Sequence, residues 1–180
     1  MKIWVSSLAQ VHGTAAQASP AKVISLLSPG DIFPVIEGID GPHHHKMHLH
    51  DIREERDGLV APQQLHVETL VNFLDTEWSA DAPLLVHCWA GISRSTATAL
   101  IAACLKNPDT DEKEIAGALA QASPTAFPNT RIAAFADEIM GRGGRLAQAA
   151  QEICSDTERL AVVTTINEAK PFSMEAQFGS

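Results

Sequence analysis

The feature that most constrains this fold is an apolar run that leads into a cysteine, a short loop and a second apolar segment. Residues 84–95 read Leu-Leu-Val-His-Cys-Trp-Ala-Gly-Ile-Ser-Arg-Ser. Residues 83–86 are predicted to form a buried strand, because a short continuous apolar run is typical of one. A helix is predicted after the loop from apolar side chains at helical spacing: Ala97, Leu100, Ile101, Cys104 and Leu105. The loop is therefore expected to join the end of a strand to the start of a helix.

That position equips the loop to bind an anion. The first N–H groups of a helix have no partner within the helix, and consecutive N–H groups in a tight turn form a concave anion site. Gly91 allows such a turn without a Cβ clash, and the planar guanidinium of Arg94 matches two oxygens of a phosphate. We therefore expect phosphate to bind to Cys88, Trp89, Ala90, Gly91, Ile92, Ser93 and Arg94.

Cys88 is the candidate nucleophile. The loop amides, the helix N-terminus and Arg94 each favour the thiolate, which is the reactive form of a cysteine. Ser95 could donate a hydrogen bond to the sulfur. Trp89 could line the mouth of the pocket or pack against a neighbouring loop, and His87 could orient the loop or simply end the strand.

His87, Cys88, Gly91, Arg94 and Ser95 together resemble the signature of the cysteine-dependent protein tyrosine phosphatases, whose phosphate loop (P-loop) reads Cys-x5-Arg. Within that superfamily they are similar to the dual-specificity-type phosphatases and their bacterial relatives. The resemblance implies one phosphatase domain over residues 1–150, with residues 151–180 as a C-terminal extension of unknown role.

The implied activity is hydrolysis of a phosphorylated protein, phosphotyrosine first, or of a small phosphomonoester. Cys88 attacks phosphorus to give a phosphocysteine intermediate, and Arg94 and the loop amides hold the phosphate oxygens. Ser95 assists the departing sulfur when water hydrolyses the intermediate. No cofactor and no metal is implied.

The resemblance also implies a general acid, an Asp on a mobile loop before the cysteine that protonates the leaving oxygen. Two residues compete for this role. Asp57 has the spacing from the cysteine that the family shows, and Gly58 and Pro62 after it resemble the family's acid loop. Asp51 ends a segment, residues 47–51, that resembles the family's strand end. Because loops tolerate insertions better than strand ends do, Asp51 ranks first and Asp57 second, and either could be a solvated loop carboxylate.

Strand and helix patterns alternate along the chain, which predicts an α/β fold with a central, mostly parallel sheet and helices on both faces. Strands are expected over residues 2–5, 22–27, 33–36, 47–51 and 83–86. Helices are expected over residues 8–18, 62–78 and 97–105, from near residue 111, and over residues 132–139 and 146–154. Residues 156–180 show no clear pattern and could pack on the domain, pack on a partner or be mobile.

Five histidines fall within residues 43–50. A native metal site usually draws its ligands from separate elements with a defined geometry. The simpler interpretation is a polar loop that leads into a strand, in which Met47 and Leu49 face the interior while His48 and His50 face the other way. We therefore expect no functional metal site here, although nickel or zinc could bind adventitiously.

Net charge and cysteine content limit the classes of partner and the cellular location that we expect. The formal net charge of −9 argues against nucleic acid or an anionic membrane as the main partner, so phosphate is expected to be captured locally. No apolar run is long enough to span a membrane, and the first residues lack the apolar core of a signal peptide. Three cysteines give no disulfide framework, and a reducing cytoplasm suits a thiolate. A cytoplasmic location is expected.

Two other classes of function remain open. A catalytically silent phosphate-binding module would keep Arg94 and the loop but lack a usable acid. A thiol-redox or sulfur-transfer enzyme would need a second thiol near Cys88, for which Cys104 is the candidate, although a core thiol is the simpler interpretation of Cys104. The side chain that faces the loop, whether Asp51, Asp57 or Cys104, separates these classes.

Overall fold

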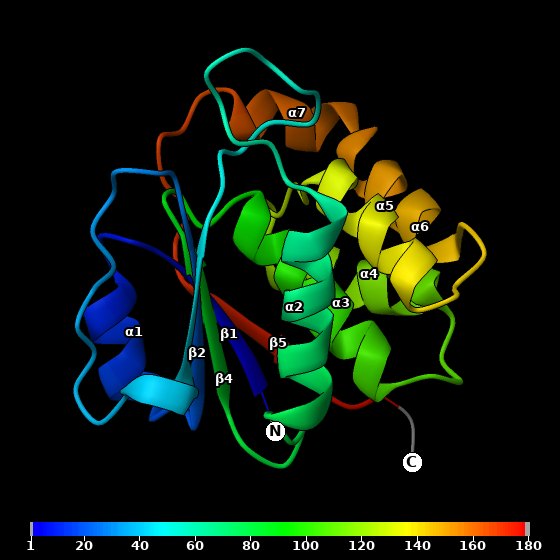
Figure 1. Cartoon of the computed structure of the whole chain (residues 1–180). Coiled ribbons are helices and arrows are strands. Elements are labelled where there is room, and N and C mark those ends of the chain that lie inside the picture. Colours follow the sequence, from blue (N-terminus) through cyan, green and yellow to red (C-terminus); the bar gives the residue numbers. More distant parts are fainter. Residues whose placement is uncertain (1, 179–180) are drawn as a thin grey trace.

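The computed structural model describes residues 2–178, and within them a five-stranded sheet forms the centre of the molecule (Figure 1). Its strands lie in the order β3-β2-β4-β1-β5. Four of them are parallel: β1 (Lys2–Ser7), β2 (Lys22–Leu27), β3 (His44–His48) and β4 (Leu84–Cys88). The fifth strand, β5 (Phe172–Glu175), pairs antiparallel with β1. The expected mostly parallel sheet is therefore confirmed.

Helices cover both faces of this sheet, as expected. On one face lies α1 (Val11–Ala18), and a short 3₁₀ turn, η1 (Gly41–His43), precedes β3. The opposite face carries a larger layer (Figure 1). Its members are α2 (Gln64–Thr76), α3 (Arg94–Lys106), α4 (Glu112–Ala122), α5 (Thr130–Ile139) and α6 (Arg145–Cys154), followed by α7 (Thr157–Val163).

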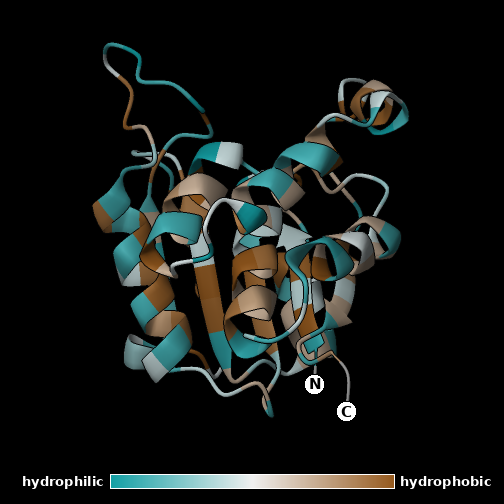
Figure 2. Ribbon diagram, turned by 90° about the vertical axis from the view of Figure 1, so that its right-hand side faces the viewer, coloured by the Kyte–Doolittle hydropathy of each residue, from teal (hydrophilic) through white to brown (hydrophobic). Residues whose placement is uncertain are grey.

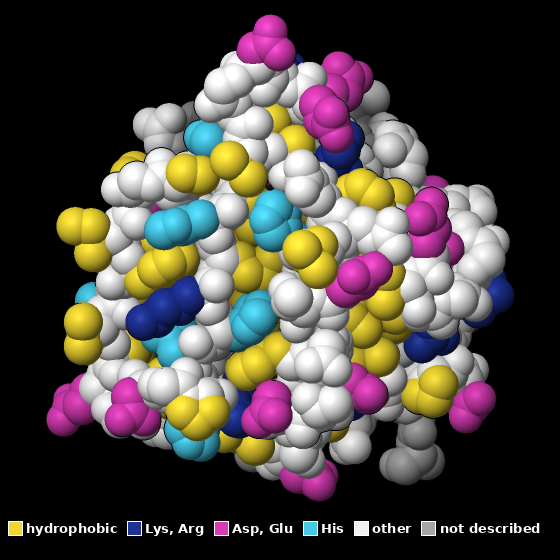
Figure 3. Space-filling model, viewed as in Figure 1, with side chains coloured by type: hydrophobic (Ala, Val, Ile, Leu, Met, Phe, Trp, Pro, Cys, Tyr) yellow, Lys and Arg dark blue, Asp and Glu magenta, His cyan; other side chains and the backbone are white. Residues whose placement is uncertain are grey.

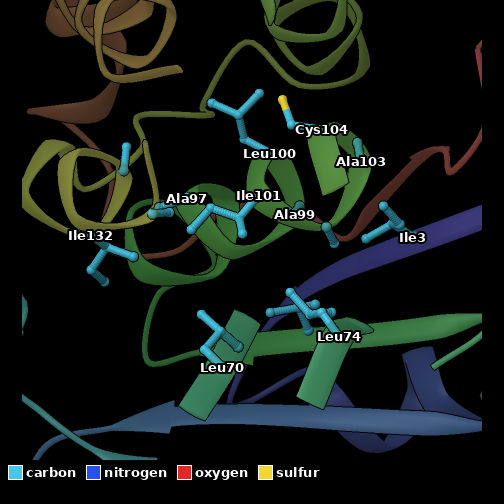
Figure 4. Close-up of a cluster of buried hydrophobic side chains, with 14 of the residues drawn as sticks. Ile3, Leu70, Leu74, Ala97, Ala99, Leu100, Ile101, Ala103, Cys104 and Ile132 are labelled. Atoms are coloured by element: carbon cyan, nitrogen blue, oxygen red, sulfur yellow. The ribbon is translucent and has the colours of Figure 1, made fainter. Parts of the chain in front are cut away.

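The main core lies between the sheet and the larger helical layer. Apolar strands fill the middle of the molecule, while the helices turn hydrophilic residues outward (Figure 2). Figure 4 shows Ile101 of α3 on the side that is nearer to Leu70 and Leu74 of α2, while Leu100 and Cys104 of α3 point away from these two leucines into the same core cluster. A smaller cluster under α1 contains Val11, Ala15, Val23, Ile36 and Leu85. Burial of apolar side chains on both faces of the sheet explains why β4 is a continuous apolar run.

Helix α3 is the central helix. Every residue from Arg94 to Cys104 is buried, so the helix is surrounded by protein instead of presenting the single apolar stripe that its spacing suggests. Alanines at positions 97, 99, 102 and 103 are each 0% exposed, and these small side chains allow neighbouring helices and strands to approach closely. The segment after the cysteine loop is therefore held rigidly from several sides.

Some boundaries differ from the sequence predictions. Residues 33–36 form no strand, only an isolated bridge between Ile36 and Ile39, because Pro34 lacks the N–H that a strand donates. The first helix begins at Val11 instead of residue 8; residues 8–10 form a turn, in which the Leu8 amide donates to the Trp89 carbonyl. Strand β3 ends at His48, earlier than expected, although Met47 and Leu49 do face the interior.

The C-terminal residues pack on the domain, which was one of the alternatives for this segment. Met174 of β5 and Ala176 are buried. The Asn107 side chain donates to the Ala176 carbonyl (2.8 Å) and accepts from the Phe178 amide (2.7 Å). A functional boundary at residue 150 stays a prediction. Across residues 2–178, no helix has the length and apolar character needed to cross a membrane.

Candidate active site

The loop between β4 and α3 lies where the parallel strands end. Cys88 is the last residue of β4, paired in register with Ser7 of β1 and Leu26 of β2, and it is 1% exposed. Helix α3 begins at Arg94, so the predicted strand–loop–helix arrangement is confirmed. Ligands of open α/β sheets characteristically bind outside the carboxyl ends of the strands, as at this loop.

Gly91 makes the tight course of the loop possible. Its φ is +73°, a region that side chains with a Cβ rarely adopt. A Cβ at this position would also lie 2.9 Å from backbone atoms of Ser6 and Ser7. The amide of Gly91 donates to Cys88 Sγ at 3.3 Å, so the turn directs at least one loop N–H toward the sulfur. Ser95 Oγ lies 3.1 Å from the same sulfur, close enough to donate as expected.

Arg94 makes hydrogen bonds through one side of its guanidinium and none through its Nε. It is 3% exposed, and its Nη1 donates to the Leu49 carbonyl at 2.7 Å and contacts Ser28 Oγ at 3.5 Å. Its Nε is buried and has no hydrogen-bond partner among residues 2–178. A buried cationic donor without a partner is costly, and an oxyanion bound in the loop would satisfy it.

Asp51 lies against this loop. Its Oδ1 accepts hydrogen bonds from Ser93 Oγ at 2.7 Å and from Asn129 Nδ2 at 2.8 Å. Its Oδ2 is 3.9 Å from Arg94 Nε. Asp57, by contrast, is exposed beyond the turn at Arg56 and has no hydrogen bond or ion pair to residues 2–178. The structure therefore brings Asp51, but not Asp57, to the loop; the acid role itself stays a prediction.

A second loop, residues 127–129, supports the first. The amide of Phe127 donates to the Ile92 carbonyl at 3.0 Å, and the amide of Asn129 donates to the Ser93 carbonyl at 3.2 Å. The Asn129 side chain also accepts from the amides of Arg131 and Ile132 and so caps α5. One asparagine thus joins the cysteine loop, Asp51 and the start of α5.

The remaining candidates occupy different surroundings. Trp89 is 57% exposed and follows Cys88, the candidate nucleophile. His87 is fully buried on the α1 side of the sheet, where burial lowers its pKa to about 4. Cys104 lies in the apolar core of α3, and burial raises its pKa to about 12. A buried thiol of that kind fits the core interpretation of Cys104 and not a redox partner.

Solved structures share this fold. The human dual-specificity phosphatase DUSP28 matches with a TM-score of 0.57 at 17% identity, covering 78% of this chain and 94% of that one. DUSP15 matches with a TM-score of 0.56 at 19% identity, covering 83% and 90%. The human tyrosine phosphatase-like serine/threonine/tyrosine-interacting protein matches with a TM-score of 0.59 at 14% identity, covering 78% and 92%. The chain has the dual-specificity phosphatase fold.

Neither a protein-family model nor a curated protein matches the sequence. At identities of 14–19%, the likeness shows the dual-specificity phosphatase fold, and any activity has to be argued from the site itself.

The fold adds contacts that sequence reasoning did not predict. The Leu49 carbonyl and Ser28 orient Arg94, the Ser93 hydroxyl binds Asp51, and the Ala169 amide donates to the Ala90 carbonyl of the loop. Most of these contacts use backbone groups or join segments far apart in sequence, so no local pattern marks them. Asn129 does carry a local signal, since an asparagine directly before a helix is a favoured N-cap.

The histidines of residues 43–50 do not converge. His44 is buried against Ser25 (2.6 Å), His45 stacks on Phe73, and His48 stacks on Phe33. Histidine side chains lie spread over the face that Figure 3 shows, among hydrophobic, neutral and basic ones. Within the described residues, no group of three or more His, Cys, Asp or Glu side chains is placed to hold a metal ion.

Proposed function

We propose that this chain is a phosphomonoester hydrolase that acts on phosphoproteins, phosphotyrosine first, through a phosphocysteine intermediate. One observation carries the proposal: the loop that begins with Cys88 also begins α3 with Arg94, and Asp51 lies against it. The Nε of Arg94 is buried without a hydrogen bond among residues 2–178, and it is 3.9 Å from Asp51 Oδ2. Nucleophile, oxyanion donor and proton donor are what phosphate-ester cleavage requires.

In the first step, the Cys88 thiolate forms a bond to phosphorus while the bond from phosphorus to the leaving oxygen breaks. Asp51 gives its proton to that oxygen. Its Oδ1 is already held by Ser93 and Asn129, so Oδ2 is the oxygen left to carry the proton. The loop amides and Arg94 bind the equatorial phosphate oxygens, where charge spreads in the transition state.

In the second step, water attacks phosphorus and gives a proton to Asp51, which now acts as the base. The sulfur–phosphorus bond breaks, and inorganic phosphate and the Cys88 thiolate are released. Ser95 Oγ, 3.1 Å from the sulfur, can donate a hydrogen bond to the departing thiolate. The cycle thus returns both Cys88 and Asp51 to their starting protonation states.

The test is hydrolysis of para-nitrophenyl phosphate by the wild type, Cys88→Ser and Cys154→Ser. Cys154 is a matched control, because it is also buried and its thiol donates to the Pro128 carbonyl, a bond that serine can keep. We expect Cys88→Ser to lose at least about 10³-fold in turnover, as when a nucleophile is removed, and Cys154→Ser to stay active.

The alternative is a silent phosphate-binding module, and one structural neighbour is itself named tyrosine phosphatase-like. Alkylation of Cys88 by iodoacetate, with and without phosphate, separates the two. If the wild type turns over no substrate but phosphate protects its Cys88 from alkylation, the chain is a silent phosphate-binding module. A wild type with neither turnover nor protection contradicts both proposals.

A further inference from the structure

One peptide unit of the cysteine loop is held from outside the loop. The amide of Gly91 donates to Cys88 Sγ at 3.3 Å. The carbonyl of the same peptide unit, that of Ala90, accepts a hydrogen bond from the Ala169 amide at 2.9 Å. In a trans peptide the N–H and C=O point in opposite directions. A donor that holds the carbonyl outward therefore holds the N–H inward, toward the sulfur.

The neighbouring carbonyls of the loop are held in the same way. The Trp89 carbonyl accepts from the Leu8 amide at 3.0 Å, and the Ile92 carbonyl accepts from the Phe127 amide at 3.0 Å. Three separate segments therefore surround the loop, and the segment between α7 and β5 is one of them. In Figure 1 this orange-red segment runs beside the green loop that follows β4.

The Ala169 amide is itself fixed in place. The Glu168 carboxylate accepts from Ser7 Oγ at 2.8 Å and also from the Gln10 side chain. Ser7 is the register partner of Cys88 in the sheet. Ala169 is 2% exposed, and β5 begins shortly after it and pairs with β1. Anchors on both sides therefore limit the movement of this amide relative to the loop.

We propose that Glu168 and Ala169 are positioning residues for the nucleophile. Ala169 keeps the Gly91 N–H directed at the Cys88 sulfur, and Glu168 keeps Ala169 in place. Because a hydrogen bond from an amide favours the thiolate over the thiol, loss of this support shifts Cys88 toward the unreactive thiol. The effect on turnover rests on the proposed function, whereas the effect on the thiolate does not.

The decisive pair of variants is Ala169→Pro and Ala169→Gly. Proline removes the N–H and adds a ring, whereas glycine keeps the N–H and removes only the methyl group. The readout is the rate of Cys88 alkylation by iodoacetamide from pH 4 to 10, with Cys154→Ser as background. The midpoint of the profile reports how stable the thiolate is, and the plateau reports access to the sulfur. We expect the midpoint of Ala169→Pro to lie about one pH unit above that of Ala169→Gly, the size of one hydrogen bond to a charged group.

A second pair keeps the test decisive if Ala169→Pro does not fold. Glu168→Ala should move the midpoint in the same direction by a smaller amount, while Glu158→Ala, an exposed carboxylate on α7, should leave it in place. If the midpoints are unchanged in folded variants and only the Tm is lower, the segment contributes to stability alone, and the proposal is overturned. A shifted midpoint in a protein without phosphatase turnover would support the positioning role and count against the proposed function alone.

Discussion

At the scale of single residues, one stretch of backbone sets both charged groups of the site. The Leu49 carbonyl orients Arg94 through a 2.7 Å hydrogen bond. Asp51, two residues further along, places its free oxygen 3.9 Å from Arg94 Nε. A shift of the segment after β3 would therefore move the guanidinium and the carboxylate together. This coupling gives a physical reason to prefer Asp51 over Asp57 as the acid. Asp57 lies on the exposed part of the same loop, where it contacts neither Arg94 nor the cysteine loop.

The choice of acid can be tested by Asp51→Asn, with Asp57→Asn as the matched control. General acids contribute about 10²–10⁴-fold, so Asp51→Asn should lower turnover by about 10²-fold or more for aryl phosphates with poor leaving groups. The loss should shrink for good leaving groups, because those oxygens depart without a proton. The measurement is the dependence of kcat on leaving-group acidity and on pH.

In the same experiment Asp57→Asn should behave as the wild type. If the two variants exchange these behaviours, Asp57 is the acid. If neither departs from wild type, the proton comes from another group.

At the scale of elements, the loop at residues 127–129 joins the cysteine loop, Asp51 and α5. Its backbone supports the carbonyls of Ile92 and Ser93. Its Asn129 side chain caps α5 through the oxygen and holds Asp51 through the nitrogen. The N-terminus of a packed helix thereby determines where the candidate acid lies.

Asn129→Asp and Asn129→Ala separate these two roles. Aspartate keeps the oxygen that caps α5 but replaces the nitrogen donor by an oxygen that repels Asp51. It should therefore unfold at nearly the wild-type Tm and lose roughly tenfold in turnover, the size of one hydrogen bond to a charged group. Alanine also loses the cap, which costs about 1 kcal/mol in the free energy of unfolding. Thermal unfolding and kcat are the readouts, and full activity in Asn129→Asp would contradict the role given to this nitrogen.

At the scale of the whole molecule, a buried polar row crosses the sheet beneath α1. Ser25 Oγ lies 2.6 Å from His44 Nε2 and 2.5 Å from His87 Nε2, which links β3, β2 and β4. A hydroxyl has one proton, so one ring donates to it and the other accepts from it. The pKa values of both histidines are lowered to about 4, His44 by burial and the charges of Lys46 and His45, and His87 chiefly by burial.

These pKa values make stability depend on pH. In the unfolded chain both histidines take up protons near pH 6.5, whereas in the folded chain they stay neutral down to about pH 4. Protonation therefore favours the unfolded state as the pH falls through this window. Between pH 7 and 5 the free energy of unfolding should fall by on the order of 1 kcal/mol for each histidine.

Urea unfolding at pH 7 and pH 5 measures this loss of stability. The free energy of unfolding of His44→Gln should fall less than that of the wild type between the two pH values. That of the exposed control His43→Gln should fall as much as that of the wild type. An equal loss in all three proteins would show that other groups cause the pH dependence.

The sequence by itself determined the strand, cysteine loop and helix, because these depend on local apolar runs, helical spacing and a glycine that the turn requires at residue 91. It also determined the parallel sheet, since strand–helix–strand alternation leaves few other arrangements. It left Asp51 and Asp57 as competing candidates for the acid, because the number of residues along a loop does not determine which of its side chains lies against the cysteine loop.

Only the tertiary structure decided which groups surround the loop. The Leu49 carbonyl at Arg94, the Ala169 amide at Ala90, and Ser25 between two histidines are contacts between distant segments. Most of them use backbone atoms, which every residue carries, so the residue types in the sequence do not predict these contacts. The same is true of β5, whose four residues are too few for a pattern and whose place is set by the open edge of β1.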